Sequence, residues 1–382
     1  MEQLPRLGKV LILSASAGAG HVRAADALVQ AFHSEGAARE IYHLDTLQYT
    51  TKALRNVYSK AYIEMANKAP ELLGWIYDVT DKVRKPEKRM QALERLNVGL
   101  FMRLLKRHQP DLVVNTHFLP ADIITHLRHR EKLTCKQAVV VTDFDVHSLW
   151  FNPSVEYYFT ACEEARVYMS AMGINAGNIH TTGIPIDSSF GITVDKKTAR
   201  RTLGLDADIP VVIISAGGFG VGNMEQILQS LMQTRNPVTV LAMCGRNAEL
   251  KERVESLQLT QQSAQSKSRI VPVGFTTAMH DYMSAADIMI GKPGGLTASE
   301  SLAKGLAMVI INPIPGQEER NSDYLLEQGA AVKCNNLPTL AYKLDSLLDS
   351  PERLVAMQLS ALRTATPHAA RDIVRILRRS AQ

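Results

Sequence analysis

Segment 291–305 carries residue types that could hold a phosphorylated ligand. Two adjacent glycines, Gly294 and Gly295, lie between a predicted strand and a helix that starts near Leu296. Backbone N–H groups at a helix N-terminus carry a partial positive charge, so they can bind a diphosphate without a lysine. Glu300 lies one turn into this helix, where its carboxylate could accept both hydroxyls of a ribose. The alternative role of the two glycines is that of ordinary turn residues.

A second polar cluster follows the next predicted strand, 308–311. After two prolines, Gln317, Glu318 and Asn321 crowd one loop with both hydrogen-bond donors and acceptors. Sugar hydroxyls require that mixture, because each hydroxyl donates and accepts at once. Such a loop alone is more often a solvated helix N-terminus, but its place after the glycine pair favours a sugar site.

Both clusters belong to the second of two similar units. In the first unit, four apolar residues at 10–13 lead into a loop of small residues that ends at His21, and apolar residues at helical spacing follow as far as Gly36. The same order returns at 211–222, followed by a helical stretch at 224–232. A repeated strand, glycine loop and helix predicts two α/β domains in tandem, each with a parallel sheet.

The remaining strand candidates place polar residues at one edge of each sheet. In the first half, strands 112–114 and 138–141 are each followed directly by polar residues, and the second half offers strands 238–242, 270–273 and 288–290. In open parallel sheets ligands bind beyond the carboxyl ends of the strands. Glycine, proline and aspartate interrupt the pattern at 183–191, and a charged helix is predicted over 196–203. We therefore expect domains at 1–185 and 186–365, with a last amphipathic helix within 366–382.

Composition narrows the class of protein. The 382 residues are 46% apolar and 21% charged, which excludes intrinsic disorder, and the net charge of +5 is too small to argue for nucleic acid. The four cysteines are far apart, show no metal-ligand spacing, and fit a reducing cytoplasm. No stretch is long and apolar enough to span a bilayer. Segment 52–107 holds 13 basic and 6 acidic residues, which indicates either a solvated helical insertion or a surface that binds anionic lipid.

Five ordered motifs resemble one known family. Segments 291–300, 315–318 and 17–21, together with 141–147 and 182–187, resemble the family that joins monogalactosyldiacylglycerol synthases, bacterial diacylglycerol glucosyltransferases and the peptidoglycan N-acetylglucosaminyltransferase. The resemblance runs from about residue 8 to 365. It implies a GT-B glycosyltransferase, with two Rossmann-like domains facing a central cleft, that uses a nucleotide sugar and inverts the anomeric carbon.

The resemblance also implies roles for individual residues. The second domain would hold the donor, with Glu300 on the ribose and the loop at 317–321 on the hexose. Segments 244–247 and 274–275 would border the base of the nucleotide. The full expected donor set is Gly218, Phe219, Gly220, Gly245, Arg246, Phe275, Gly294, Gly295, Leu296, Thr297, Glu300, Gln317, Glu318 and Asn321.

The chemistry needs one base and a stabilised leaving group. His21 is the candidate base, because histidine titrates near neutrality and this residue matches the histidine that ends the glycine loop in the family. We expect Asp143 to orient or assist it, and which of the two is the base stays open. The alternatives are a histidine that only packs or caps locally and an aspartate that merely ends a strand.

Asp143 and Asp145 also spell the DxD pattern that binds metal in the other large glycosyltransferase fold. They lie in the first half, away from the donor motifs, and a helix terminus can neutralise a diphosphate. We therefore expect no metal requirement, with segment 142–150 facing the acceptor.

The leading hypothesis is transfer of glucose or galactose from UDP-glucose or UDP-galactose to diacylglycerol, by a cytoplasmic enzyme peripheral on the anionic inner face of the cell membrane. The alternatives are another lipid acceptor such as a polyprenyl-diphosphate sugar, a nucleotide-sugar epimerase, and a non-catalytic UDP-sugar-binding protein. A dehydrogenase is disfavoured because neither glycine loop completes the dinucleotide-binding pattern.

Overall fold

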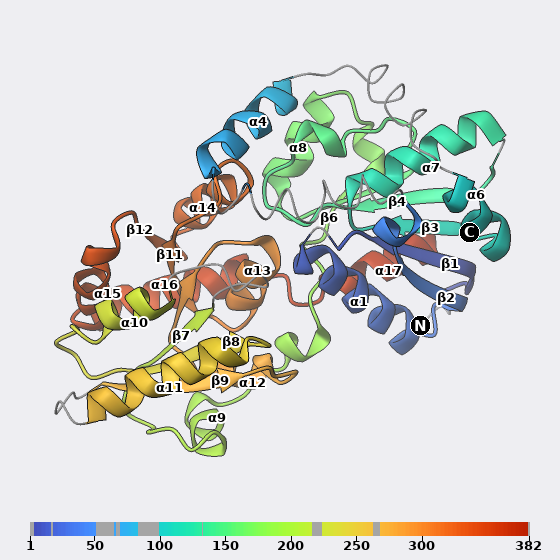
Figure 1. The fold of residues 1–382 in the computed structure, drawn as a ribbon. Coiled ribbons are helices and arrows are strands. Elements are labelled where there is room, and N and C mark those ends of the chain that lie inside the picture. Colours follow the sequence, from blue (N-terminus) through green and yellow to red (C-terminus); the bar gives the residue numbers. More distant parts are fainter. Residues whose placement is uncertain are drawn as a thin grey trace.

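Two six-stranded parallel sheets form the frame of the molecule (Figure 1). The structure is a computed structural model that describes residues 4–16, 18–50, 65, 69–82, 99–131, 133–215, 224–262 and 268–380. Each sheet is covered by helices on both faces, which confirms the predicted α/β class with two parallel sheets. Among these residues, no helix combines the length and apolar character needed to cross a membrane.

The N-terminal sheet has the strand order β2-β1-β3-β4-β5-β6. The interior strand β1 pairs with β2 and β3, and residues 10–13 are fully buried. A parallel strand covered on both faces is apolar without alternation, which is why this run was readable in the sequence. The strands are β1 (Leu7–Ser14), β2 (Ala38–Asp45), β3 (Leu112–Asn115), β4 (Lys136–Val140), β5 (Tyr157–Thr160) and β6 (Ile179–Thr181). The helices are α1 (Ala19–Ser34), η1 (Thr46–Tyr49), α4 (Pro70–Lys82), α6 (Gly99–His108), α7 (Phe118–Glu131), η3 (Ser148–Trp150), α8 (Glu163–Ala171) and η4 (Ala176–Asn178).

The C-terminal sheet has the strand order β12-β11-β10-β7-β8-β9. Pro272 lies in β9, the last strand of that order, where an edge tolerates the missing N–H of proline. The strands are β7 (Val211–Ser215), β8 (Thr239–Gly245), β9 (Arg269–Gly274), β10 (Ile288–Gly291), β11 (Ala307–Ile311) and β12 (Ala331–Cys334). The helices are η5 (Ser188–Gly191), α9 (Lys196–Thr202), α10 (Met224–Leu231), α11 (Ala248–Gln262), α12 (Met279–Ala285), α13 (Gly295–Ala303), α14 (Gln317–Glu327), η6 (Leu337–Thr339), α15 (Leu340–Leu348) and α16 (Pro351–Thr364).

The chain crosses between the two halves twice, and the two crossings touch. Gly183 has a φ of +92°, and a Cβ there would lie 1.9 Å from the Thr366 hydroxyl, so only glycine fits between the two crossing segments. After the second crossing, α17 (Ala369–Arg379) packs on α1 and adds Ile373 and Val374 to the core of the N-terminal half. The Arg375 guanidinium pairs with Glu35 at 3.1 Å. These contacts tie the last helix to the first domain.

Candidate active site between the two sheets

The starts of α1 and α13 face each other across the boundary between the halves. Each helix follows a loop at the carboxyl end of a strand, β1 and β10 respectively. A Cβ on Gly20 would lie 3.5 Å from the Leu296 side chain, and a Cβ on Gly295 would lie 2.0 Å from the carbonyl oxygen of Thr142. Glycine is therefore required at position 295 by the close approach of the opposite domain.

His21 lies in the first turn of α1 with its ring orientation set by backbone. Its Nδ1 is 2.9 Å from the carbonyl oxygen of Thr116 and 3.0 Å from the hydroxyl of Thr142. A carbonyl oxygen can only accept, so Nδ1 carries the proton and Nε2 keeps a lone pair. Burial lowers the pKa of His21 to about 4, against a smaller opposing effect of the Thr116 carbonyl. The imidazole is thus neutral at pH 7 and able to accept a proton through Nε2.

Two aromatic side chains, those of His117 and Trp150, lie beside His21. The ring of His117 stands edge-on at 4.7 Å between centroids, and that of Trp150 lies at 6.4 Å. His117 is buried, and burial lowers its pKa well below the ordinary value. His117 and the Thr116 carbonyl were not among the candidate site residues named from the sequence, whereas Trp150 ends the segment 142–150 that we expected to face the acceptor. The polar end of the strand at 112–114 was the available signal for Thr116 and His117.

Asp143 does not orient His21, which corrects one expectation. Its carboxylate instead accepts hydrogen bonds from the amides of Gln317, at 2.6 Å, and Asn321, at 3.0 Å, across the domain boundary. Burial raises the pKa of Asp143 to about 6, although both amides oppose the shift. The physical reason for the correction is that a backbone carbonyl already satisfies Nδ1 of His21, while α14 offers two amides to the carboxylate.

Glu300 is buried one turn into α13 and pairs with Arg23 of α1. Its side chain is 4% exposed, whereas that of Arg23 is 44% exposed. Burial raises the pKa of Glu300 to about 7, and the nearby Arg23 only partly offsets this effect. A carboxylate held in this way needs hydrogen-bond donors, and Arg23 supplies one from the first domain. Arg23 was not predicted from the sequence.

Two carboxylates in the first turn of α14 accept hydrogen bonds from the backbone of the loop that precedes this helix. Glu318 accepts a hydrogen bond from the backbone N–H of Ile314 at 2.7 Å, and Glu319 accepts one from Gly316 at 3.2 Å. Gly316 has a φ of +87°, which favours glycine. A Cβ on Gly294 would lie 3.7 Å from Glu318, so this loop lies beside the start of α13. The structure thus brings the two polar clusters of the sequence together.

The residues predicted to border the base lie at the ends of β8 and β9. The guanidinium of Arg246 lies 4.3 Å from the centre of the Phe275 ring, which is 58% exposed. Gly245 has a φ of +58° and allows the chain to turn directly after β8. Of the other expected donor residues, Leu296 is buried and Thr297 half-buried in the first turn of α13. Gly218, Phe219 and Gly220 lie outside the described residues.

The two DxD carboxylates have separate partners. Asp145 pairs with the guanidinium of Arg320 at 2.8 Å, and Asp143 binds the amides described above. Within the described ranges, no group of three His, Cys, Asp or Glu side chains has the proximity that a metal ion would need.

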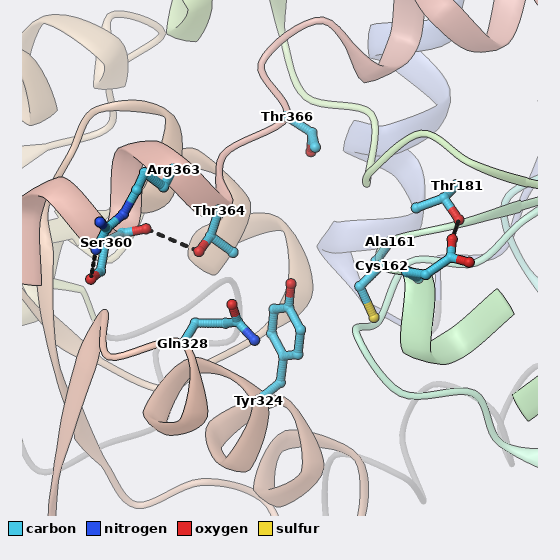
Figure 2. Close-up of a pocket in the computed structure, with 10 residues that line it drawn as sticks. Ala161, Cys162, Thr181, Tyr324, Gln328, Ser360, Arg363, Thr364 and Thr366 are labelled. Carbon is cyan, nitrogen blue, oxygen red and sulfur yellow. Dashed lines mark hydrogen bonds between the residues drawn. The ribbon is translucent and has the colours of Figure 1, made fainter. Parts of the chain in front are cut away.

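A separate cavity of about 500 Å³ lies near the second chain crossing (Figure 2). Cys162 and Thr181 line it from the first half, and Tyr324, Arg363 and Thr366 from the second. None of the predicted site residues lines this cavity, so it is distinct from the site at His21 and Glu300.

Known proteins match the chain over most of its length. Residues 21–186 match the family described as monogalactosyldiacylglycerol (MGDG) synthase, and residues 195–362 match glycosyl transferases group 1. The processive diacylglycerol beta-glucosyltransferase of Bacillus cereus is 30% identical over 369 residues, which cover 96% of this chain and 92% of that protein. The protein of the same name from Bacillus licheniformis is 27% identical over 350 residues, covering 91% and 89%. The resemblance read from the motifs is confirmed.

Solved structures share the architecture. Acinetobacter baumannii MurG superposes with a TM-score of 0.63 at 17% identity, covering 97% of this chain and 99% of that one. Staphylococcus aureus MnaA, solved with UDP, gives a TM-score of 0.62 at 12% identity, covering 96% and 95%. These likenesses confirm the predicted GT-B fold.

Proposed function

Because the chain belongs to the family of the processive diacylglycerol β-glucosyltransferases, we propose that it transfers a hexose, glucose or galactose, from a UDP-sugar to diacylglycerol with inversion. The product is a β-glycosyldiacylglycerol. The observation that carries this proposal is the facing pair of helix starts. A buried carboxylate on α13 lies opposite an imidazole on α1 whose free nitrogen is Nε2.

The donor lies along the C-terminal half in this proposal. Its diphosphate binds the amides of Gly295, Leu296 and Thr297, where Gly294 adds no side-chain cap and the first turn holds no acidic residue. The ribose hydroxyls donate to Glu300 and displace Arg23. The helix N-terminus neutralises the diphosphate, so catalysis requires no divalent ion.

The two ends of the donor lie on the neighbouring loops. The nucleotide base lies against the side chains of Arg246 and Phe275, next to Gly245. The hexose lies by Gln317, Glu318 and Asn321. The amides of Gln317 and Asn321 donate hydrogen bonds to Asp143 in the described arrangement. The hexose must therefore share or replace those hydrogen bonds. Donor binding therefore loosens the contact between the halves at Asp143.

Transfer needs a single proton acceptor on the acceptor side. Nε2 of His21 takes the proton of the diacylglycerol hydroxyl as its oxygen forms a bond to the anomeric carbon, and the bond from that carbon to UDP breaks on the opposite face. The Thr116 carbonyl holds the Nδ1 proton throughout and stabilises the imidazolium that forms. UDP leaves with its charge at the start of α13.

We propose that the enzyme works on the anionic inner surface of the cell membrane, where its acceptor resides. The basic excess of segment 52–107 supports this placement, since each basic residue close to an anionic surface adds about 1 kcal/mol. Most of that segment lies outside the described residues.

The deciding experiment supplies labelled UDP-glucose and UDP-galactose separately, with diacylglycerol vesicles, and identifies the lipid product by mass spectrometry. A labelled glycosyldiacylglycerol from one donor is the expected result. Label on a polyprenyl lipid only, interconversion of the UDP-sugars without lipid, or binding without turnover would each replace the proposal by one of the alternatives named above.

A further inference from the structure

Helix α4 leaves one apolar side uncovered in the part of the chain that the structure describes. Leu72, Trp75 and Val79 are 50%, 63% and 37% exposed. At about 100° per residue these three positions fall within about 60° of one another around the helix. They form a narrow apolar face, here called the outer face of α4, and the indole of Trp75 is its most exposed side chain.

The opposite side of α4 packs on the loop that precedes α14. A Cβ on Gly74 would lie 2.7 Å from Cβ of Pro315, so only glycine permits this approach. The ring of Tyr77 covers Gly316, where an added Cβ would lie 2.7 Å from it. This is the loop that carries Gln317 and Glu318. Figure 1 shows α4 lying over α14, although the two are far apart in the sequence.

Arg320 binds α4 to both halves of the molecule. Its guanidinium contacts Asp81 of α4 at 3.0 Å and Asp145 of the N-terminal half at 2.8 Å. It also lies 5.1 Å from the centre of the Tyr77 ring. Of the three acidic residues of α4, Asp81 is turned inward to this arginine, Asp78 pairs with it at 3.6 Å from a more exposed position, and Glu71 is exposed beside Trp75.

The segment after β4 completes the seat of α4. Nε2 of His147 lies 3.0 Å from the carbonyl oxygen of Tyr77, and the backbone N–H of Ser148 donates to Asp81 at 2.7 Å. Movement of α4 would therefore change its contacts with the loop before α14 and also those with segment 142–150, which is predicted to face the acceptor.

We propose that α4 is a lipid-sensing helix whose outer face enters an anionic bilayer and whose inner face then holds the loop at Pro315–Gly316 in the form that binds the hexose. The proposal rests on the proposed function, because the hexose is assigned to that loop. It predicts that membrane binding and UDP-sugar binding strengthen each other.

The chemistry of the outer face and its surroundings selects a bilayer as the partner. Tryptophan is the residue most suited to the boundary between lipid headgroups and hydrocarbon, and leucine and valine beside it add apolar contact. The sequence on either side of α4, 52–69 and 83–98, contains nine lysines and arginines against three glutamates. That excess complements an anionic surface, and the proposed acceptor is itself a membrane lipid.

The first test measures insertion without using activity. The chain has two tryptophans, and Trp150 is buried at 5% exposure, so quenching by brominated lipid reports on Trp75. Vesicles of phosphatidylglycerol and brominated phosphatidylcholine should quench the fluorescence, and Leu72→Ser/Trp75→Ser should weaken flotation about tenfold. Val355→Ser/Leu359→Ser on α16 removes a comparably exposed pair and should leave flotation unchanged. Absence of quenching at low salt would overturn the proposal.

The second test measures coupling through the inner face. The dissociation constants of UDP-glucose and UDP-galactose are measured with and without the same vesicles, in wild type and in Tyr77→Ala, which keeps the outer face. In wild type, vesicles should tighten the binding of the preferred UDP-sugar about fivefold, and that sugar should tighten vesicle binding by the same factor. Tyr77→Ala should keep vesicle binding and lose the coupling. Equal coupling in Tyr77→Ala, or none in wild type, would overturn the proposal.

These measurements are separable from the proposed function. Failure of the proposed function appears as the absence of a glycosyldiacylglycerol product, whereas quenching and linked binding need no turnover. A protein that makes the product but shows no linkage would retain the proposed function and lose the lipid-sensing helix.

Discussion

Replacing Glu300 by glutamine tests whether this carboxylate is kept for ligand binding at a cost in stability. Burial raises its pKa from the ordinary 4.5 to about 7, so the folded protein favours the protonated form. A raised carboxyl pKa means that stability falls as pH rises from 4.5 to 7 and stays low above 7. The difference corresponds to about 3 kcal/mol at pH 8.

Glu300→Gln removes the ionisation and leaves Arg23, already 44% exposed, free to be solvated. At pH 8 the variant should therefore melt at least as high as wild type and as much as about 5–10 °C higher. Its melting temperature should also vary less than that of wild type between pH 5 and pH 8. Well below pH 4.5 the two proteins should converge, because the carboxyl group is then protonated in both the folded and the unfolded state.

The same substitution should weaken UDP binding about 10- to 100-fold, because the ribose hydroxyls lose a charged acceptor. Calorimetric titration with UDP and melting curves over the pH range are the two assays. Lower stability than wild type at pH 8, together with unchanged UDP affinity, would mean that Glu300 is neither destabilising nor a ligand of the nucleotide.

Three further outcomes follow from the site. His21→Ala should lower kcat about 100-fold or more with the UDP dissociation constant unchanged, and full retained turnover would remove the histidine from its role as base. Arg23→Met should tighten UDP binding by up to about fivefold, because it removes the group that competes for Glu300, and weaker binding would mean that Arg23 serves the donor directly. Chelation with EDTA should leave the transfer rate unchanged, and a rate restored only by a divalent ion would contradict the assignment of the diphosphate to α13.

The apolar strands were readable from the sequence because they are buried on both faces. The runs at 10–13, 211–214, 288–290 and 308–311 each became a strand, and the glycine pair before α13 was found with them. Strands β2, β5, β6 and β12 were missed. The edge strand β2 has two exposed charged residues, Arg39 and Glu40, followed by half-buried residues that include His43 and Asp45, and β6 has only three residues, so neither shows a continuous apolar run.

The contacts between the halves could not be read from the sequence. His21, Glu300 and the loop at 317–321 were predicted from their types and their places after strands. Their hydrogen-bond partners depend on how the two sheets meet, which the sequence does not show. Asp143 was therefore expected to orient His21, whereas its carboxylate accepts hydrogen bonds from Gln317 and Asn321. Arg23 looks like an ordinary exposed helix residue, and the contact of Tyr77 with Gly316 joins segments more than two hundred residues apart.

A crystal structure of the protein with UDP tests the central assignment most directly. We expect the diphosphate at the amides of Gly295 and Leu296, the ribose on Glu300, and Arg23 released from that carboxylate. A nucleotide bound at another place, with Arg23 still paired to Glu300, would contradict it.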